Sequence, residues 1–216
     1  MRAMFDSVVG RYDVVNDALS LGLDRRWRSL TARAVGAKSG DVVLDLGTGT
    51  GKLSAQLGPA IRVVGVDLSA PMLAVARERR STLRAVQGSA LRLPFHEGSF
   101  EAVMSAFVLR NLSDLQPAFA ELARVVRPGG RVALVDITQP PRVVVRVLFN
   151  GYFGVAAPLL GRLVGRADAY RYLVRSVSTL PPPEEVCRML GFVGFVSCRA
   201  RLFAGGMTTL WTATRR

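Results

Sequence analysis

The chain has 216 residues, half of them apolar, and a formal net charge of +13. A chain of this length and hydrophobicity is expected to form a single domain over residues 1–216. The amino terminus lacks a secretory signal, and the longest apolar run (147–161) is shorter than the ~20 residues of a membrane-spanning helix, which predicts a cytoplasmic protein. The charge favours anionic partners such as nucleic acid, phospholipid headgroups or an acidic ligand.

Strand and helix patterns alternate over the first two thirds of the chain. Apolar runs at 41–47, 61–67, 83–88, 100–108 and 131–137 are typical of buried strands. Helices are predicted at 70–80, capped by Ser69, and at 115–126, where Ser113 and Gln116 have the spacing of a capping box. This βαβ spacing predicts an α/β fold with a mostly parallel, doubly wound sheet.

The carboxyl-terminal third departs from this alternation. A helix at 181–192 precedes two strand-like runs, 195–203 and 208–215, which flank Ala-Gly-Gly and predict an antiparallel hairpin at the sheet edge. These runs bring the expected sheet to about seven strands. Residues 140–178 interrupt the pattern, and we expect them to form a helical insertion over the active site.

Metal and thiol chemistry are not indicated. Cys187 and Cys198 lack the spacing of metal ligands, so we expect reduced, structural thiols and no metal site. His96 is the only histidine, and the sequence around it is typical of a surface turn, so we do not expect it to act in catalysis.

The first strand opens into a loop with glycine at alternate positions, Gly47, Gly49 and Gly51. This spacing differs from the dinucleotide fingerprint and from a Walker loop. Asp67 ends the second strand, where a carboxylate can accept hydrogen bonds from both hydroxyls of a ribose. A compact nucleoside with an amino-acid tail fits such a turn.

Three further features match that ligand. Asp45 precedes the loop, Ser89 and Ala90 follow the third strand, and RPGGRVALVDI occupies residues 127–137. In this order the motifs resemble those of the class I S-adenosylmethionine-dependent methyltransferases. The resemblance implies a Rossmann-like fold and S-adenosylmethionine as the cofactor.

Segments outside the cofactor motifs are similar to the ubiquinone/menaquinone biosynthesis C-methyltransferases. They are MFDSVVGRYDVVNDALSLGLDRRWR (4–28), FVLRNLSD (107–114), DAYRYLVRS (168–176) and LFAGGMTTLWTATR (202–215). This resemblance implies methylation of a ring carbon of a polyprenylated hydroquinone, either demethylmenaquinol or the benzoquinol of ubiquinone biosynthesis. It also implies that residues 1–36 form an amino-terminal lid. The sequence does not decide the oligomeric state, and a homodimer is one possibility.

The resemblance assigns cofactor contacts along four segments of the chain. The residues are Asp45, Gly47, Gly49, Thr50, Gly51, Asp67, Ser89, Ala90 and Ser105. Two positions depart from the family pattern. Lys52 stands where an aspartate is common, and Ala106 stands where a serine is common, with Ser105 adjacent.

A ring carbon is a poor nucleophile unless the neighbouring phenol loses its proton, so the protein must stabilise a phenolate and align the ring with the methyl group. Arg110 and Asn111 follow an apolar strand, and we expect both to point into the cleft. Since a guanidinium does not readily give up a proton, Arg110 is expected to stabilise the phenolate or to orient water. Asn111 is expected to hydrogen-bond the same oxygen, and Tyr12 of the lid is the third catalytic candidate.

The insertion combines apolar residues with arginines. Residues 143–164 are largely apolar, and Arg142, Arg146, Arg162 and Arg166 accompany them. This composition is typical of interfacial helices on anionic lipid, so we expect transient contact with the inner face of the cell membrane; an ordinary amphipathic helix pair is the alternative. Substrate-contacting residues are expected further along the insertion, at Tyr170, Arg171 and Tyr172.

Three other functions stay open at this point. They are methylation of another small phenolic metabolite, methylation of RNA, and binding of S-adenosylmethionine without catalysis. The first is compatible with the fold, since one fold hosts many substrates. The second would use the positive charge, but the sequence contains no nucleic-acid-binding module, so we do not expect nucleic acid as a partner.

Overall fold

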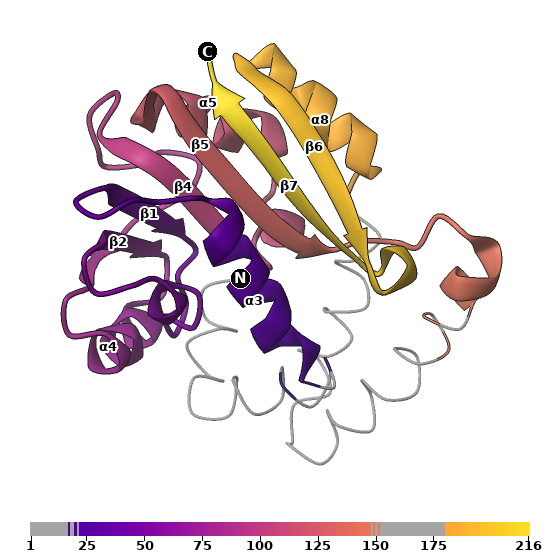
Figure 1. Ribbon diagram of the computed structural model, residues 1–216, viewed down its shortest axis with the longest axis horizontal. Coiled ribbons are helices and arrows are strands. Elements are labelled where there is room, and N and C mark those ends of the chain that lie inside the picture. The colour runs from indigo at the N-terminus through magenta and orange to yellow at the C-terminus, as the bar shows by residue number, and fades with distance from the viewer. Residues whose placement is uncertain (1–16, 18–19, 21, 148, 150, 152–179) are drawn as a thin grey trace.

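The computed structural model describes residues 17, 20, 22–147, 149, 151 and 180–216 (Figure 1). Its centre is one seven-stranded sheet in the order β3-β2-β1-β4-β5-β7-β6. The strands are β1 (Val42–Leu46), β2 (Arg62–Asp67), β3 (Arg84–Gln87), β4 (Phe100–Ala106), β5 (Val126–Ile137), β6 (Phe195–Phe203) and β7 (Thr208–Arg215). The first five pair in parallel, while β7 is antiparallel to both β5 and β6.

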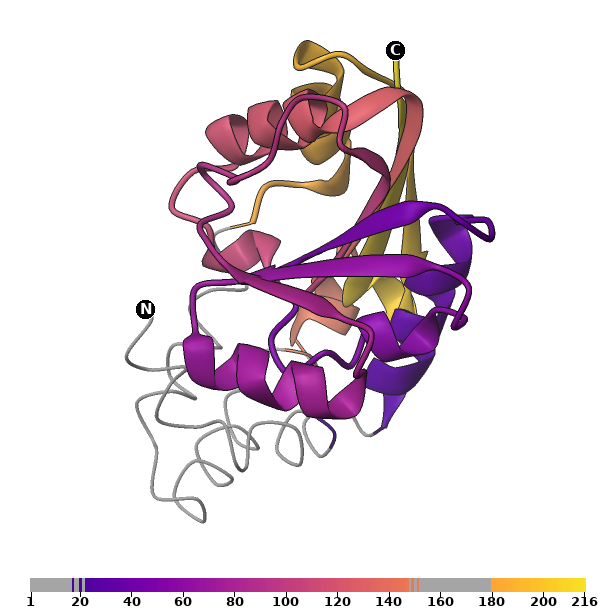
Figure 2. The ribbon, with the colours of Figure 1, turned by 90° about the vertical axis from the view of Figure 1, so that its left-hand side faces the viewer.

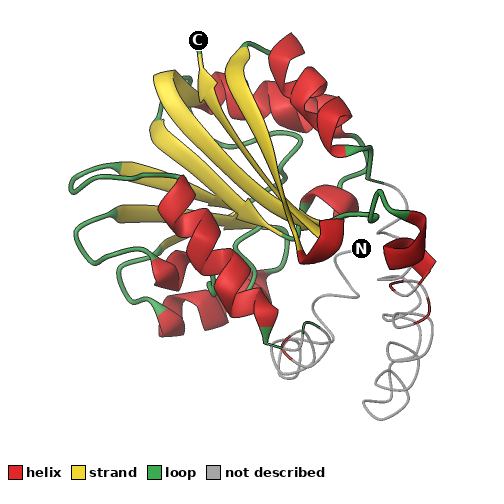
Figure 3. Cartoon of the chain, turned by 45° about the vertical axis from the view of Figure 1, so that its right-hand side comes forward, coloured by secondary structure: helices red, strands yellow, loops and turns green. Residues whose placement is uncertain are grey.

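Helices cover both faces of this sheet (Figure 3). They are α3 (Leu23–Ala34), α4 (Ala70–Arg79), α5 (Leu115–Val125) and α8 (Pro183–Phe192). Trp27 of α3 and Ala76 of α4 belong to one buried apolar cluster, whereas Phe119 of α5 and Leu190 of α8 belong to the other. Figure 2 shows α4 and α5 on opposite sides of the strands. The doubly wound, mostly parallel sheet predicted from the sequence is therefore confirmed.

Alternation along the strands explains how one sheet supports two cores. On β1, Leu44 and Leu46 pack in the cluster on the α5 side, and Val43 packs in the cluster on the α3 side. Because successive side chains of a strand point to opposite faces, Asp45 lies on the α3 side with Val43. On this side of the sheet Asp45 reaches the side chains of Thr48 and Ser54.

Local signals predicted most helix ends and the hairpin. Ser69 caps α4 through its side chain, which accepts a hydrogen bond from the Met72 N–H. The cap of α5 was predicted wrongly: Asp114, not Ser113, accepts the hydrogen bond from the Gln116 N–H. The hairpin of β6 and β7 at the sheet edge is confirmed, with residues 204–206 forming its turn.

The expectation of reduced cysteines is wrong. Cys187 of α8 and Cys198 of β6 form a disulfide, with their Cα atoms 5.5 Å apart. The register of β6 against β7 shifts between Val196 and Arg199, and Ser197 in this bulge has a φ of 54°. A bulge re-aims neighbouring side chains, and both cysteines pack against the apolar core shared by α8 and β6. No residue pattern in the sequence indicates this bulge, so the disulfide between Cys187 and Cys198 could not be predicted from the sequence.

Candidate functional site

A cavity of about 260 Å³ lies at the carboxyl ends of β1, β2 and β4, beside the point where the strand order reverses. Ligands of doubly wound sheets bind at such a reversal. The cavity is lined by residues of α3, α4, β1, β2 and β4 and of the segments that follow β1, β2, β3 and β4. Its described lining residues are Arg28, Leu46, Gly47, Thr48, Gly49, Thr50, Val66, Asp67, Leu68, Ser69, Met72, Gly88, Ser89, Ala90, Leu91, Ala106, Phe107, Val108, Asn111, Leu112 and Ser113.

The three loop glycines serve different purposes. A Cβ on Gly47 would lie 2.3 Å from a methyl carbon of Val108, and a Cβ on Gly51 would lie 3.1 Å from Ala76 of α4. These two glycines therefore let the loop pack against the protein itself, and Gly51 does not line the cavity. A Cβ on Gly49 would meet no atom of the described residues within 4 Å, although its φ of 53° favours glycine. Gly49 is the glycine that leaves space for a ligand.

Asp67 is held firmly at the cavity wall. Its Oδ2 accepts a hydrogen bond from the Gly49 N–H at 2.9 Å, and its Oδ1 accepts one from the Ser69 N–H at 2.9 Å. These two bonds tie the end of β2 to the glycine loop and fix the orientation of the carboxylate. Asp67 is the anionic group among the described lining residues.

Asp45 does not line the cavity, although a cofactor contact was expected. Its Oδ2 accepts hydrogen bonds from the Thr48 hydroxyl at 2.7 Å and from the Ser54 hydroxyl at 2.5 Å and N–H at 3.1 Å. Burial raises the pKa of the Asp45 carboxyl to about 6, and the hydrogen bonds of Ser54 and Thr48 and the charge of Arg28 oppose this rise. The carboxyl therefore organises the loop from beneath.

The segment after β3 reaches the cavity as predicted. Ser89 and Ala90 line it, together with Leu91, whose N–H donates to the Ser89 hydroxyl at 3.2 Å. Leu68 lies on the same cavity and is 44% exposed, an apolar side chain that the sequence did not single out. Leu68 and Leu91 offer the apolar contacts that a flat aromatic ligand requires.

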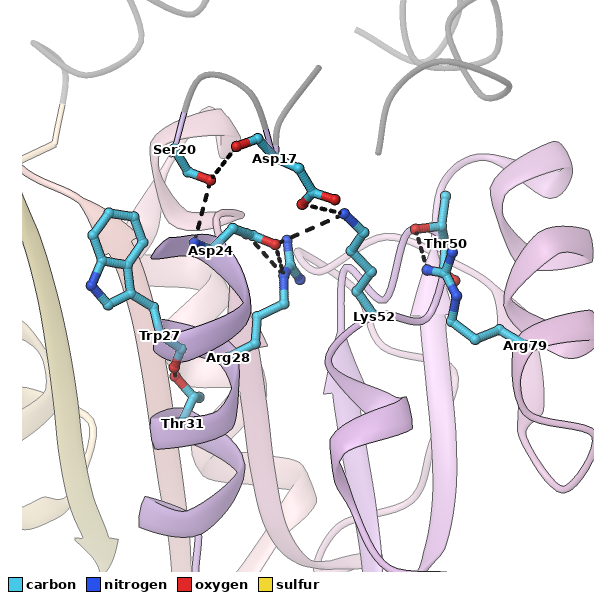
Figure 4. Close-up of polar contacts among 9 residues, drawn as sticks. All are labelled: Asp17, Ser20, Asp24, Trp27, Arg28, Thr31, Thr50, Lys52 and Arg79. Carbon is cyan, nitrogen blue, oxygen red and sulfur yellow. Dashed lines mark hydrogen bonds and ion pairs between the residues drawn. The ribbon is translucent and has the colours of Figure 1, made fainter. Parts of the chain in front are cut away.

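Thr50 and Ser105 have different environments. Thr50 lines the cavity, and its hydroxyl and carbonyl accept hydrogen bonds from Arg79 at 3.0 and 2.8 Å (Figure 4). Ser105 is buried within β4 and donates to the Leu46 carbonyl at 2.8 Å, so it joins β4 to β1 and does not line the cavity. A ligand contact of Ser105 stays a prediction, and its neighbour Ala106 is the residue of this pair that lines the cavity.

Arg110 does not point into the cavity, which corrects the sequence prediction. Its guanidinium forms an ion pair with Asp136 of β5, and its N–H donates to the same carboxylate at 3.1 Å. Both residues are buried, with 8% and 0% exposed surface. Asn111 does line the cavity, and its Nδ2 donates to the Phe107 carbonyl at 3.1 Å. Of these two adjacent residues, Arg110 thus belongs to a buried ion pair and Asn111 to the cavity wall.

Phe107 is a lining residue that the sequence did not reveal as special. It has a φ of 64°, which is rare for a residue with a large side chain. Two guanidinium groups lie over its ring, that of Arg28 at 5.0 Å and that of Arg110 at 5.7 Å from the ring centre, and the ring packs edge-on against Trp27. Strained residues of this kind cluster at ligand sites. No sequence signal marks a positive φ at a phenylalanine.

Charged residues join α3 to the glycine loop (Figure 4). The Nζ of Lys52 lies 2.7 Å from Asp17 and 4.0 Å from Asp24, and Asp24 also binds Arg28. Lys52 therefore has acidic partners on the amino-terminal side. The lysine that replaces the common aspartate at position 52 is therefore neutralised by nearby carboxylates.

Four residues expected in the site, Tyr12, Tyr170, Arg171 and Tyr172, lie outside the described residues. Most of the expected lid and of the expected insertion lies there too. His96 is exposed in a turn region, as predicted. None of the helices in the described part of the chain has both the length and the hydropathy of a membrane-spanning segment.

Comparisons with known proteins agree with this geometry. Residues 1–215 match the model of the ubiE/COQ5 methyltransferase family. A demethylmenaquinone methyltransferase from Thermus thermophilus is 39% identical over 220 residues, which cover 98% of this chain and 100% of the relative. A ubiquinone/menaquinone biosynthesis C-methyltransferase from Hahella chejuensis is 35% identical, over 98% of this chain and 90% of the relative.

Among solved structures, a SAM-dependent methyltransferase from Thermotoga maritima superposes with a TM-score of 0.69. The match covers 100% of this chain and 99% of that one at 17% identity, which supports the fold alone. The fold, the cavity and the relatives converge on one conclusion. The chain is a methyltransferase with a Rossmann-like fold and belongs to the ubiE/COQ5 methyltransferase family.

Proposed function

We propose that this methyltransferase transfers the methyl group of S-adenosylmethionine to a ring carbon of a polyprenylated quinol, with demethylmenaquinol as the preferred substrate. The carrying observation is the cavity that joins Gly49, Asp67 and Asn111 in a chain similar to demethylmenaquinone methyltransferases over nearly its full length. Demethylmenaquinol is preferred because the Thermus thermophilus relative is named a demethylmenaquinone methyltransferase. The Hahella chejuensis relative is also named for ubiquinone biosynthesis, so the benzoquinol is tested as a second substrate.

The described residues fit this cofactor. In the proposal Asp67 binds the ribose hydroxyls, Gly49 allows close approach to the loop, and Ser89 and Ala90 contact the adenine, with Leu68 beside them. The cofactor supplies an electrophilic methyl group on a sulfonium. The protein's part is to hold the adenosine and to exclude water from the reacting groups.

Asn111 is the proposed polar contact for the quinol. Its Nδ2 donates one hydrogen bond to the Phe107 carbonyl, which fixes the amide, and in the proposal its Oδ1 accepts a hydrogen bond from a substrate hydroxyl. Apolar neighbours Ala106, Val108 and Leu112 line the same part of the cavity and suit an aromatic ring. A hydrogen bond from the quinol hydroxyl to Asn111 would orient the ring toward the methyl donor.

Arg110 acts in this proposal as a positioning residue, not as a direct phenolate contact. Its guanidinium neutralises buried Asp136 and lies 5.7 Å from the ring of Phe107, which lines the cavity. Tyr12 is proposed to complete the catalytic group from the lid, and Tyr170, Arg171 and Tyr172 to contact the substrate from the insertion.

Contact with anionic lipid belongs to the same proposal, because a polyprenyl tail is scarcely soluble in water. Val143, Val144 and Val147 are 62%, 72% and 64% exposed at the start of the expected insertion, next to Arg142 and Arg146. Apolar side chains beside cations are typical of interfacial helices. Flotation with anionic vesicles should decrease as salt rises and after Val144→Asp; flotation indifferent to salt would contradict the electrostatic part.

The decisive assay uses S-adenosylmethionine labelled in its methyl group and demethylmenaquinol kept reduced. Label should enter the lipid, and the oxidised quinone should not react, because it has no phenol to ionise. Asn111→Leu should lower kcat, whereas Asp67→Ala should weaken cofactor binding. Cofactor binding without transfer to either quinol would refute the proposal, as would transfer to RNA instead of lipid.

A further inference from the structure

The cavity carries opposite charges at two places. Among its described lining residues, Arg28 is the cation and Asp67 is the anion. Asp67 ends β2, whereas Arg28 contacts Phe107 after β4 and acts electrostatically on Asp45 of β1. The two charges therefore lie toward different strands, on either side of the β1 loop. A ligand that fills the cavity can therefore meet both a carboxylate and a guanidinium.

Arg28 is buried and only partly satisfied by the protein. It is 9% exposed, and its Nε donates to both carboxylate oxygens of Asp24 at 3.0 Å. Among the described residues, its terminal nitrogens Nη1 and Nη2 have no hydrogen-bond acceptor. These two nitrogens are not among the fully buried polar atoms, and Arg28 lines the cavity. The arrangement leaves the outer edge of the guanidinium for a ligand.

The glycine loop itself offers few donors for an anion. The N–H groups of Thr48, Gly49 and Gly51 already donate to Val66, Asp67 and Thr48, respectively. An anionic group of the ligand near the loop therefore needs a side-chain cation. Arg28 is held in place for this task by Asp24 and by its stacking on the Phe107 ring (Figure 4 shows the first of these contacts).

We infer that Arg28 binds the carboxylate of the amino-acid end of the cofactor through Nη1 and Nη2, while Asp67 binds the ribose. The inference rests on the proposed function, because it assumes S-adenosylmethionine as the ligand. A guanidinium edge matches the two oxygens of a carboxylate, and such charge-assisted pairs are stronger than neutral ones. Arg28 thereby fixes the amino-acid end and, through it, the position of the sulfonium.

The test compares ligands that differ only in this carboxylate. Calorimetry measures the Kd of S-adenosylhomocysteine and of S-adenosyl-3-thiopropylamine, which is the same molecule without the carboxylate, for the wild type and Arg28→Met. The variant should bind S-adenosylhomocysteine about 10- to 100-fold more weakly. The decarboxylated ligand should bind both proteins almost equally. Arg28→Lys should still bind S-adenosylhomocysteine more tightly than the decarboxylated ligand, but by a smaller factor than the wild type. Lysine keeps the positive charge but lacks the two parallel N–H donors of the guanidinium.

The ratio of the two affinities protects the test against partial misfolding, since both ligands report on the same folded molecules. Arg33→Met, at an exposed position of α3, is the matched control and should leave both affinities unchanged. Equal weakening of both ligands by Arg28→Met, or no weakening, would overturn the assignment of Arg28. A raised KM for the quinol with intact cofactor discrimination would overturn it too and place Arg28 at the substrate. Failure of the wild type to bind S-adenosylhomocysteine would instead refute the proposed function.

Discussion

The buried carboxyl of Asp45 makes stability depend on pH in a direction that can be checked. Burial raises its pKa from 3.8 to about 6. The native state therefore retains a proton on Asp45 over a range where the unfolded chain has lost it. The stabilising contribution is fully present below pH 3.8 and is lost as the pH rises through about 6.

The magnitude follows from the size of the shift. A change of about two pKa units corresponds to ~3 kcal/mol of unfolding free energy. Asp45→Asn removes this titration while its side-chain oxygen can still accept from Thr48 and Ser54. Relative to Asp45→Asn, the wild type should therefore lose ~3 kcal/mol between pH 4 and pH 7, with the change centred between about 4 and 6.

Urea denaturation of both proteins at a series of pH values measures this difference. Other titrating groups are present in both proteins, so their contributions cancel in the comparison. Glu97→Gln, at an exposed position, controls for the loss of one carboxylate. A constant difference in unfolding free energy between wild type and Asp45→Asn across the whole pH range would contradict a raised pKa of Asp45.

Three further predictions concern the disulfide, the loop and the buried ion pair. Cys187→Ser opens a loop with a sequence separation of 11 and should cost about 3 kcal/mol of unfolding free energy, a loss that a reductant reproduces in the wild type but not in the variant. Gly49→Ala should weaken S-adenosylhomocysteine binding by about tenfold or more and cost only ~1 kcal/mol of stability, measured by calorimetry and urea denaturation; a large stability loss with normal binding would contradict the role of Gly49. Arg110→Met should cost about 3–5 kcal/mol because it leaves Asp136 buried without its cation, and adding Asp136→Asn should recover part of that loss; equal stability of the single and double variants would argue against this explanation.

Local patterns in the chain determined the parallel sheet, the terminal hairpin and the approximate position of the cavity. A short apolar run that ends in glycines specifies a buried strand and a tight turn wherever the rest of the chain lies. The same locality explains why Asp67, Ser89 and Ala90 all line the cavity: each lies at or after the end of a strand, and the carboxyl ends of parallel neighbours meet at one edge.

Tertiary structure alone decided which neighbours of those residues face the cavity. Arg110 and Asn111 are adjacent in the chain, yet one pairs with Asp136 and the other lines the cavity, because a short turn after β4 directs them differently. The role of Arg28 likewise depends on α3 packing beside Phe107, and the disulfide depends on a bulge in β6. Such features arise from contacts between distant segments and from backbone angles that residue types do not encode. The sequence thus determined the family and the frame of the site, while the direction of each polar side chain was set by packing.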